Sequence, residues 1–389
     1  MSQRLASHVA NLPPSGIRKF FDLVATMKDV ISLGVGEPDF VTPWSVRESG
    51  IFSLEQGQTM YTSNAGIFEL RDELAHHLNC SFGLSYNPAD EILVTTGASE
   101  AVDLAMRAVL EPGDVVLIPD PSYVSYAPCA ILAGADVQFV PTYAREDFRL
   151  RVEDLAKVYS PKVKLLVLSY PNNPTGAIMS KEDLLPIAEF AAEHDILVLT
   201  DEIYSDLTYG GTHVSFASLP GMRERTLFIS GFSKSYAMTG WRIGYAAGPA
   251  DLIGGLIRIH QYTMLCAPIT GQIAALEALR SAGEAKQEMV TAYDRRRHLM
   301  VHGFREMGLD CFEPLGAFYV FPNISKTNLT SEDFAEELLK EENVAVVPGT
   351  AFGPSGEGHI RCSYAYSLEQ LQEALKRISR FVQSRLNNK

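Results

Sequence analysis

The sequence has few of the features that would place a protein in a membrane or on a nucleic acid. Its 389 residues contain 33 lysines and arginines against 47 aspartates and glutamates, and the net charge of −14 disfavours non-specific binding to a phosphate backbone. No apolar run reaches membrane-spanning length, and no basic start is followed by an apolar core. We therefore expect a cytoplasmic protein that binds neither membranes nor nucleic acids.

Cysteine and the common metal and nucleotide motifs are equally sparse. The five cysteines lie far apart without a C-x-x-C, which predicts free thiols in a reducing compartment rather than a disulfide framework. The histidines have no zinc-ligand spacing, so we expect no metal site. The chain lacks both the Gly-Lys dipeptide of a Walker A loop and a G-x-S-x-G elbow, which disfavours P-loop and serine-hydrolase chemistry.

What is present is an alternation of short apolar runs with helix-period segments between about residues 91 and 248. Continuous apolar runs separated by helices predict a mostly parallel sheet covered on both faces. The predicted strands are 92–95, 115–118, 137–140, 165–168, 196–199 and 227–229. The fold class expected is α/β, a large domain of this kind with a smaller α+β domain.

The C-terminal third has a different pattern, which suggests the division into domains. Long helical patterns follow residue 269, then strands are predicted at 317–321, 344–347 and 359–363, and a last helix with Ser367 and Gln370 as a capping box. We expect an N-terminal arm that contributes to the small domain at 1–44, a large domain at 45–285, and a small C-terminal domain at 286–389. The segment 11–16 is predicted to be an extended arm.

Several predicted strands of the large domain end in unusual polar sequences. In open α/β sheets, ligands bind outside the carboxyl ends of the strands, so we expect these segments to converge on one site. They are residues 95–99, 119–123, 170–176, 201–204 and 233–234.

Lys234 is the most informative residue of these segments, because no acidic residue lies within eight positions on either side. A lysine without charged neighbours is expected to be sequestered, and a desolvated amine can be neutral and form a Schiff base. Arg242 follows beyond Thr239-Gly240 and is suited to hold a phosphate. A reactive amine and a phosphate clamp are what pyridoxal phosphate requires.

The stretch S-G-F-S-K-S-Y-A-M-T-G-W-R-I-G-Y, residues 230–245, strongly resembles the lysine signature of fold-type-I, class I aminotransferases. T-D-E-I-Y-S-D at 200–206, N-P-T-G at 173–176 and R-C-S-Y-A at 361–365 resemble further motifs of that family, in family order. The resemblance extends from about residue 15 to the last helix. Within the family, the sequence most resembles the prokaryotic aspartate and aromatic aminotransferases. The resemblance implies a pyridoxal-phosphate-dependent aminotransferase that acts as a homodimer with shared active sites, with amino acids and 2-oxo acids as its small-molecule substrates.

The resemblance also implies roles for individual residues. Lys234 would hold the cofactor as a Schiff base, Asp201 would pair with its pyridinium nitrogen, and Tyr204 would donate to its ring oxygen. Asn173 would contact the ring oxygen and the substrate carboxylate, and Arg361 would grip the α-carboxylate. The other implied contacts are the phosphate cup of Gly97, Ala98, Ser99, Ser233 and Arg242, the ring-stacking Tyr123, Tyr61 reaching the partner's phosphate, and the Gly36 backbone beside the substrate.

Each of these residues also has a plainer structural interpretation when taken alone. Lys234 could be a turn lysine, Asp201 or Ser99 a helix cap, and Tyr123 or its neighbour Tyr126 a packing residue. Glu202, which has no implied role, is expected to face water. Two alternatives remain for the whole protein: a pyridoxal-phosphate lyase on the same fold, or a non-catalytic ligand-binding regulatory protein.

The expected reaction moves an amino group from an L-amino acid to a 2-oxo acid, with 2-oxoglutarate as the expected acceptor and ping-pong kinetics. The donor is aspartate-type or aromatic. The uncharged, partly aromatic stretch 261–267 favours aromatic or broad specificity over aspartate alone, and Arg18 is a candidate for an additional cation.

Overall fold

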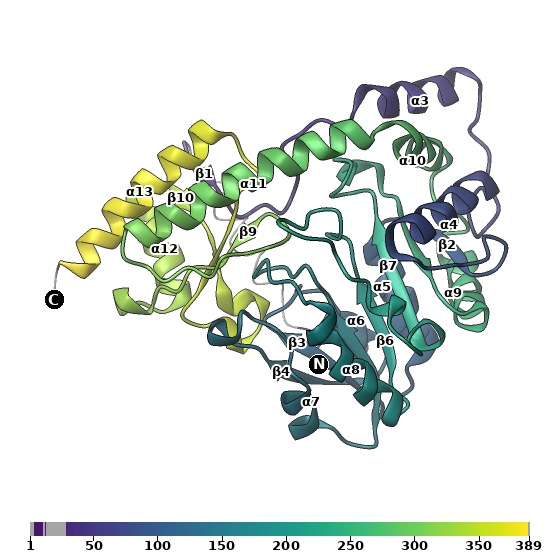
Figure 1. Ribbon diagram of the computed structural model, residues 1–389, viewed down its shortest axis with the longest axis horizontal. Helices are drawn as coiled ribbons and strands as arrows, with labels where there is room; N and C mark the ends of the chain where they lie inside the picture. Colours follow the sequence, from purple (N-terminus) through teal and green to yellow (C-terminus); the bar gives the residue numbers. More distant parts are fainter. Residues whose placement is uncertain (1–3, 11, 13–28, 388–389) are drawn as a thin grey trace.

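The computed structural model describes residues 4–10, 12 and 29–387, and its elements form two groups joined by the long helix α11, Gly283–Glu306 (Figure 1). Of the expected arm at 11–16 only Leu12 is described, and Arg18 lies outside the described residues. The expected domain boundary at 285 falls in the first turn of α11.

A seven-stranded sheet with the order β2-β8-β7-β6-β5-β3-β4 forms the centre of the larger group. Only β8 runs against its neighbours, so the prediction of a mostly parallel sheet in an α/β fold is confirmed. The strands are β2 Ile92–Thr95, β3 Val115–Asp120, β4 Asp136–Pro141, β5 Val163–Leu168, β6 Leu197–Asp201, β7 Thr226–Gly231 and β8 Gly244–Ala247.

Strand β8 has no counterpart among the predicted strands, because its sequence G-Y-A-A has neither an apolar run nor many β-branched residues. Its small residues serve close packing instead: a Cβ at Gly244 would overlap the backbone of Ala98. Pairing with β8 also extends β7 through Ser230 and Gly231, where the sequence predicted that the strand would end.

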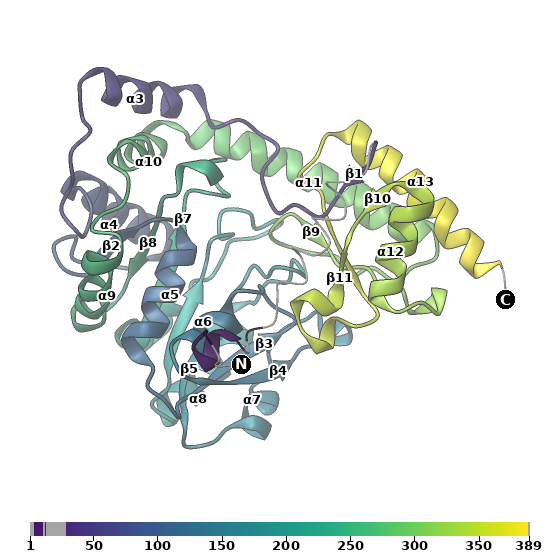
Figure 2. The same ribbon diagram turned by 180° about the vertical axis from the view of Figure 1, so that it is seen from behind.

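Helices cover both faces of this sheet (Figures 1 and 2). Val116 and Ile118 of β3 belong to an apolar cluster with α5, α6 and α9, whereas Leu117 belongs to a cluster with α7 and α8. This alternation is the two-residue period of a strand buried on both sides. The helices of this group are α3 Trp44–Glu55, α4 Phe68–Phe82, α5 Ala98–Val109, α6 Tyr126–Leu132, α7 Val152–Val158, α8 Lys181–Glu193, α9 Ala250–Thr263 and α10 Ile269–Ser281, with the short α1 Ser7–Ala10 preceding them in the chain.

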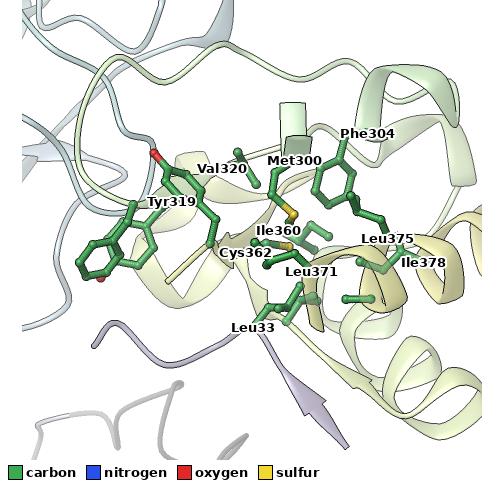
Figure 3. Packing of buried hydrophobic residues seen from close by; sticks show 14 of the residues in the cluster. Leu33, Met300, Phe304, Tyr319, Val320, Ile360, Cys362, Leu371, Leu375 and Ile378 are labelled. Carbon is green, nitrogen blue, oxygen red and sulfur yellow. The ribbon is translucent and has the colours of Figure 1, made fainter. Parts of the chain in front are cut away.

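The second group packs helices on small sheets around its own apolar cluster (Figure 3). In this cluster Leu33, which follows β1, lies with Met300 of α11 and Leu371 of α13, so a segment near the start of the chain packs with C-terminal elements. The other elements are β1 Ile31–Ser32, β9 Tyr319–Val320, α12 Ser331–Glu342, β10 Val344–Ala345, β11 Val347–Pro348, β12 Ile360–Ser363 and α13 Leu368–Leu386.

The last helix begins as the sequence predicted. Ser367 and Gln370 form a capping box in which each side chain accepts from the other residue's backbone N–H, at 3.3 and 3.4 Å. Leu371, Ile378 and Val382 lie on the buried stripe of the helix. None of the described helices combines the length and the apolar character needed to cross a membrane.

Candidate active site

A cavity of about 810 Å³ lies where the polar strand ends of the large sheet meet β9, β12 and residues 34–37. The polar segments after β3, β5, β6 and β7 and the start of α5 all contribute to its lining. The candidate residues among the lining are Gly36, Ala98, Ser99, Tyr123, Asn173, Asp201, Tyr204, Ser233, Lys234, Arg242 and Arg361.

Lys234 follows β7 and extends into this cavity. Its Nζ donates to the Gly36 carbonyl oxygen at 2.6 Å and lies 5.8 Å from the centre of the Phe318 ring. Burial lowers the pKa of Lys234 to about 8; the carboxylate of Glu37 opposes this shift, and the guanidinium of Arg361 adds to it. A useful fraction of the amine is therefore neutral near pH 7, and only the neutral amine is a nucleophile.

Asp201, at the end of β6, is a buried carboxylate. Its Oδ2 accepts from the Tyr126 hydroxyl at 2.8 Å and its Oδ1 from the backbone N–H of Ile203 at 3.2 Å. Burial raises the pKa of Asp201, and the hydrogen bond from Tyr126 opposes that rise. A buried carboxylate of this kind would be stabilised by a cation that enters the cavity.

Tyr126 therefore contacts the candidate site, whereas the sequence was also compatible with a packing role for this residue. Its hydroxyl also lies 2.9 Å from Ser169 Oγ, and its ring meets that of Tyr123 edge to face with centroids 5.5 Å apart. The sequence places Tyr126 three residues after Tyr123, so either tyrosine could reach the site. This spacing alone does not show which of the two contacts Asp201.

Glu202 does not face water, and that expectation was wrong. The residue is only 2% exposed, and its carboxylate accepts from His213 Nε2 at 2.7 Å and from Ser215 Oγ at 2.8 Å. Successive side chains of a strand point to opposite faces of the sheet. Asp201 therefore points toward the cavity, and Glu202 points into the apolar layer on the opposite face. There it needs partners, which His213 and Ser215 provide.

Arg361 lies in β12 and is 3% exposed. Its Nη1 donates to Asn173 Oδ1 at 2.8 Å, and its guanidinium carbon lies 4.4 Å from the Tyr319 ring centroid and 4.7 Å from that of Phe352. Its Nε has no hydrogen-bond partner within the described chain. The two rings hold the guanidinium plane in place, and a planar fork of this kind suits a carboxylate.

Tyr204 and Tyr319 form a pair that the sequence did not predict. Their hydroxyls lie 2.8 Å apart, and burial raises the pKa of both phenols. The Tyr319 hydroxyl also occupies the space beside Gly36 that a Cβ at that position would need. The apolar sequence around Tyr319 reads as a plain strand, so nothing in it indicates this role.

The first turn of α5 lies beside Arg242, an arrangement suited to an anion. Gly97 has φ +80°, and a Cβ added to it would lie 2.5 Å from Arg242 Nη2, so only glycine allows this approach. Arg242 itself has a left-handed backbone (φ +57°), and its Nη1 donates to the Thr239 carbonyl at 2.9 Å. Free N–H groups at a helix start beside a guanidinium attract a phosphate. The Ser230 hydroxyl donates to the Glu202 carbonyl at 3.3 Å.

Tyr61 is the one candidate side chain that stands away from the others. It lies in the loop between α3 and α4 with 81% of its surface exposed, and it does not line the cavity of its own chain.

Comparisons with known proteins agree with this geometry. The family "Aminotransferase class I and II" matches residues 28–378. The chain is 46% identical to an aspartate aminotransferase of Pyrococcus abyssi, over 96% of each chain. It is 43% identical to aromatic-amino-acid aminotransferase 2 of Thermococcus litoralis, over 98% of this chain and 99% of the other. The solved aspartate aminotransferase of Thermus thermophilus with maleate, 39% identical, covers 97% of this chain and 99% of its own with a TM-score of 0.92.

The fold, the site and these matches together define a fold-type-I enzyme that uses pyridoxal phosphate. The chain belongs to the class I and II aminotransferases, as a pyridoxal-phosphate-dependent transaminase of the aspartate and aromatic subgroup. The two alternatives, a lyase on the same fold and a non-catalytic regulatory protein, find no support in these comparisons.

The residues present fit this cofactor. Asp201 is a buried carboxylate with no cationic hydrogen-bond partner among the described residues, which suits a protonated ring nitrogen. The start of α5 with Arg242 suits a phosphate, and Lys234 would supply the amine. The buried Arg361 Nε, which has no partner in the part of the chain that the structure describes, leaves a donor for a substrate carboxylate.

Proposed function

We propose that this transaminase moves the amino group of an L-amino acid with an aromatic or aspartate-type side chain to a 2-oxo acid, with 2-oxoglutarate as the acceptor. The donor would leave as its 2-oxo acid before the acceptor binds, which gives ping-pong kinetics. The observation that carries this proposal is the cavity itself, where a lysine of lowered pKa lies with a buried carboxylate and two arginines.

The residues of the chain divide the work as follows. When bound, pyridoxal phosphate supplies an electron sink for the electrons released at the substrate Cα. Lys234 Nζ would hold the cofactor and, once free, would take the proton from Cα as a general base and deliver it to the cofactor as a general acid. Asp201 keeps the ring nitrogen protonated, Arg361 and Asn173 orient the α-carboxylate, and Tyr204 donates to the ring oxygen.

The charges of the cavity favour a donor without a second carboxylate. Among the described residues that line it, the cations are Lys234, Arg242 and Arg361, and each has a role already. The remaining lining is mostly apolar, aromatic or small, and includes Val35, Val124 and Tyr123. This lining offers dispersion contacts to an aromatic side chain but no further fixed cation. Relatives are named for both aspartate and aromatic amino acids, so the donor must be measured.

A panel of donors with 2-oxoglutarate tests the proposed function. We expect phenylalanine and tyrosine to be used at least as well as aspartate by kcat/KM. We also expect Arg361→Ala to lower kcat/KM for every donor by roughly 30- to 4000-fold, because a buried charge pair with the α-carboxylate is lost. Parallel lines in initial-rate plots would support ping-pong order. Aspartate turned over a hundredfold better than either aromatic donor would refute the aromatic preference.

A homodimer is also part of the proposal. Large apolar side chains are exposed on α3, on the loop before α4 and at the end of α9, including Trp44 (57%), Phe52 (58%), Met60 (74%) and Tyr262 (87%). Large apolar side chains exposed in this way are typical of an association site. A second copy of the chain, placed by two-fold symmetry, would cover it and bring Tyr61 toward the other copy's phosphate site. The five free cysteines suit a cytoplasmic enzyme.

Mixed dimers test the shared site. Tyr61→Phe and Lys234→Ala chains, each weak or inactive alone, should regain activity when combined, because one site of each heterodimer then contains neither change. Statistical mixing gives half of the dimers one intact site, so about a quarter of wild-type activity is expected. Activity no higher than in the separate homodimers, with subunit exchange confirmed by differential tags, would count against a shared site.

A further inference from the structure

A buried pair of side chains, His260 and Glu100, lies next to the proposed phosphate site and has no part in the proposed chemistry. His260 of α9 has a side chain with no exposed surface, and its Nδ1 lies 2.7 Å from Glu100 Oε1 of α5. The Glu100 side chain is 9% exposed. An acid so near a phosphate site is unexpected, because a free carboxylate there would repel the phosphate.

The contacts of Glu100 show how the fold turns that carboxylate away. While Oε1 meets His260, Oε2 accepts from the backbone N–H of Thr96 at 2.5 Å. This bond fixes the turn just before Gly97, whose own N–H donates to the Thr95 carbonyl at 2.9 Å. The next N–H groups, those of Ala98 and Ser99 in the first turn of α5, have no acceptor within the helix and remain for an anion.

The chemistry of His260 supports a fixed orientation. Its Nε2 is buried without a partner in the described chain. We assign the proton to Nδ1, which donates to Glu100, because a proton on Nε2 would be a buried unpaired donor. Among the described residues, the His260 ring then has one polar partner, the carboxylate of Glu100 at the phosphate loop.

We propose that His260 is a positioning residue that, through Glu100, holds the loop 95–99 in the shape that binds the cofactor phosphate. The proposal rests on the assignment of Gly97, Ala98, Ser99 and Arg242 to the phosphate. Without His260, the Glu100 carboxylate would lose its buried donor, turn toward the loop and compete for its N–H groups.

The test is cofactor affinity. Apo-protein carrying His260→Leu is titrated with pyridoxal phosphate and followed by absorbance, and the dissociation constant should rise roughly 5- to 150-fold. His260→Asn, whose amide can donate from nearly the same place, should recover most of the loss. The ³¹P resonance of the bound cofactor should shift in His260→Leu and return in His260→Asn. His302→Leu is the matched control, since His302 pairs with Glu306 on the exposed face of α11 and should leave affinity unchanged.

The outcomes separate this inference from the phosphate assignment. If Arg242→Ala leaves affinity unchanged, the phosphate site itself is wrongly placed and the inference falls with it. If Arg242→Ala weakens binding but His260→Leu does not, only the inference fails. A loss in His260→Leu that His260→Asn does not recover, with an unmoved ³¹P resonance, would show mere packing and overturn the proposal. Should His260→Leu not fold, Glu100→Gln replaces it, and an unchanged dissociation constant there also overturns the proposal.

Discussion

Lys234→Ala should abolish transamination while leaving the chain folded. The lysine is expected both to attach the cofactor and to move the proton at Cα, and loss of the proton transfer alone costs about 10²- to 10⁴-fold in rate. Its side chain contacts the Gly36 carbonyl and forms no ion pair with the described residues, so its removal leaves none of their charges unpaired. Borohydride reduction of the wild type followed by peptide mapping should find the cofactor on Lys234, and the variant should fix none.

The matched control is Lys286→Ala. Lys286 is also partly buried and pairs with Asp206 at 2.7 Å, but it does not line the cavity. This variant should keep the attachment of the cofactor and most of the activity. Cofactor fixed by borohydride on any residue other than Lys234 would overturn the assignment.

The lowered pKa of Lys234 gives this experiment a pH dependence. Because only the neutral amine reacts, attachment of the cofactor to apo-protein should accelerate as pH rises through about 8 and then level off. The ordinary lysine value is 10.5, so between about pH 8 and 10.5 the unfolded chain binds more protons at this residue. The contribution of Lys234 to apo-protein stability therefore rises with pH across that window. An attachment rate flat from pH 7 to 9 would contradict the shift.

Much of the sheet could be predicted from the sequence, because strands buried on both faces are continuous apolar runs. Strands such as β3 and β5 lie within one or two residues of the predicted ranges. Strand β8 was not predicted because three of its four residues are glycine or alanine. Gly244 must be small because its backbone lies against the start of α5. The start of α13, which Ser367 caps, was predictable because its capping box is local. Contacts between residues close in the sequence can be predicted from it, whereas contacts between backbone segments far apart in the sequence cannot.

The candidate site shows the same division. A parallel sheet places the carboxyl ends of its strands along one edge. Residues at those ends, such as Asp201 and Lys234, could therefore be predicted from the sequence to lie close together. Which tyrosine meets Asp201, and that Tyr319 meets Tyr204, depends on the rotation of α6 and on the docking of β9. Neither is encoded in a short motif. Glu202 illustrates the converse error, because its charge suggested exposure where the strand direction requires burial.

Asp201→Asn should lower kcat by roughly 100- to 1000-fold or more while the cofactor remains bound. An amide has nearly the shape of the carboxylate and can still accept from the Tyr126 hydroxyl, so the local packing is kept. What it loses is the negative charge that holds a proton on the ring nitrogen, without which the ring is a poor electron sink. The measurement is single-turnover kinetics with a good donor, together with the cofactor content of the dialysed protein.

Glu202→Gln separates this charge effect from the general cost of altering a buried acid. Glu202 is the next residue, is also buried and would lose the same charge, but its carboxylate faces His213 and Ser215 rather than the cavity. If Asp201 acts through the ring nitrogen, Glu202→Gln should cost stability and little turnover, whereas Asp201→Asn should cost turnover and little stability. Equal losses of kcat in the two variants would mean that the loss in Asp201→Asn is the general cost of altering a buried acid near the site, and not a specific effect on the ring nitrogen. Near wild-type turnover in Asp201→Asn with cofactor bound would show that Asp201 is not the ring partner, because the charge would then be unnecessary for turnover.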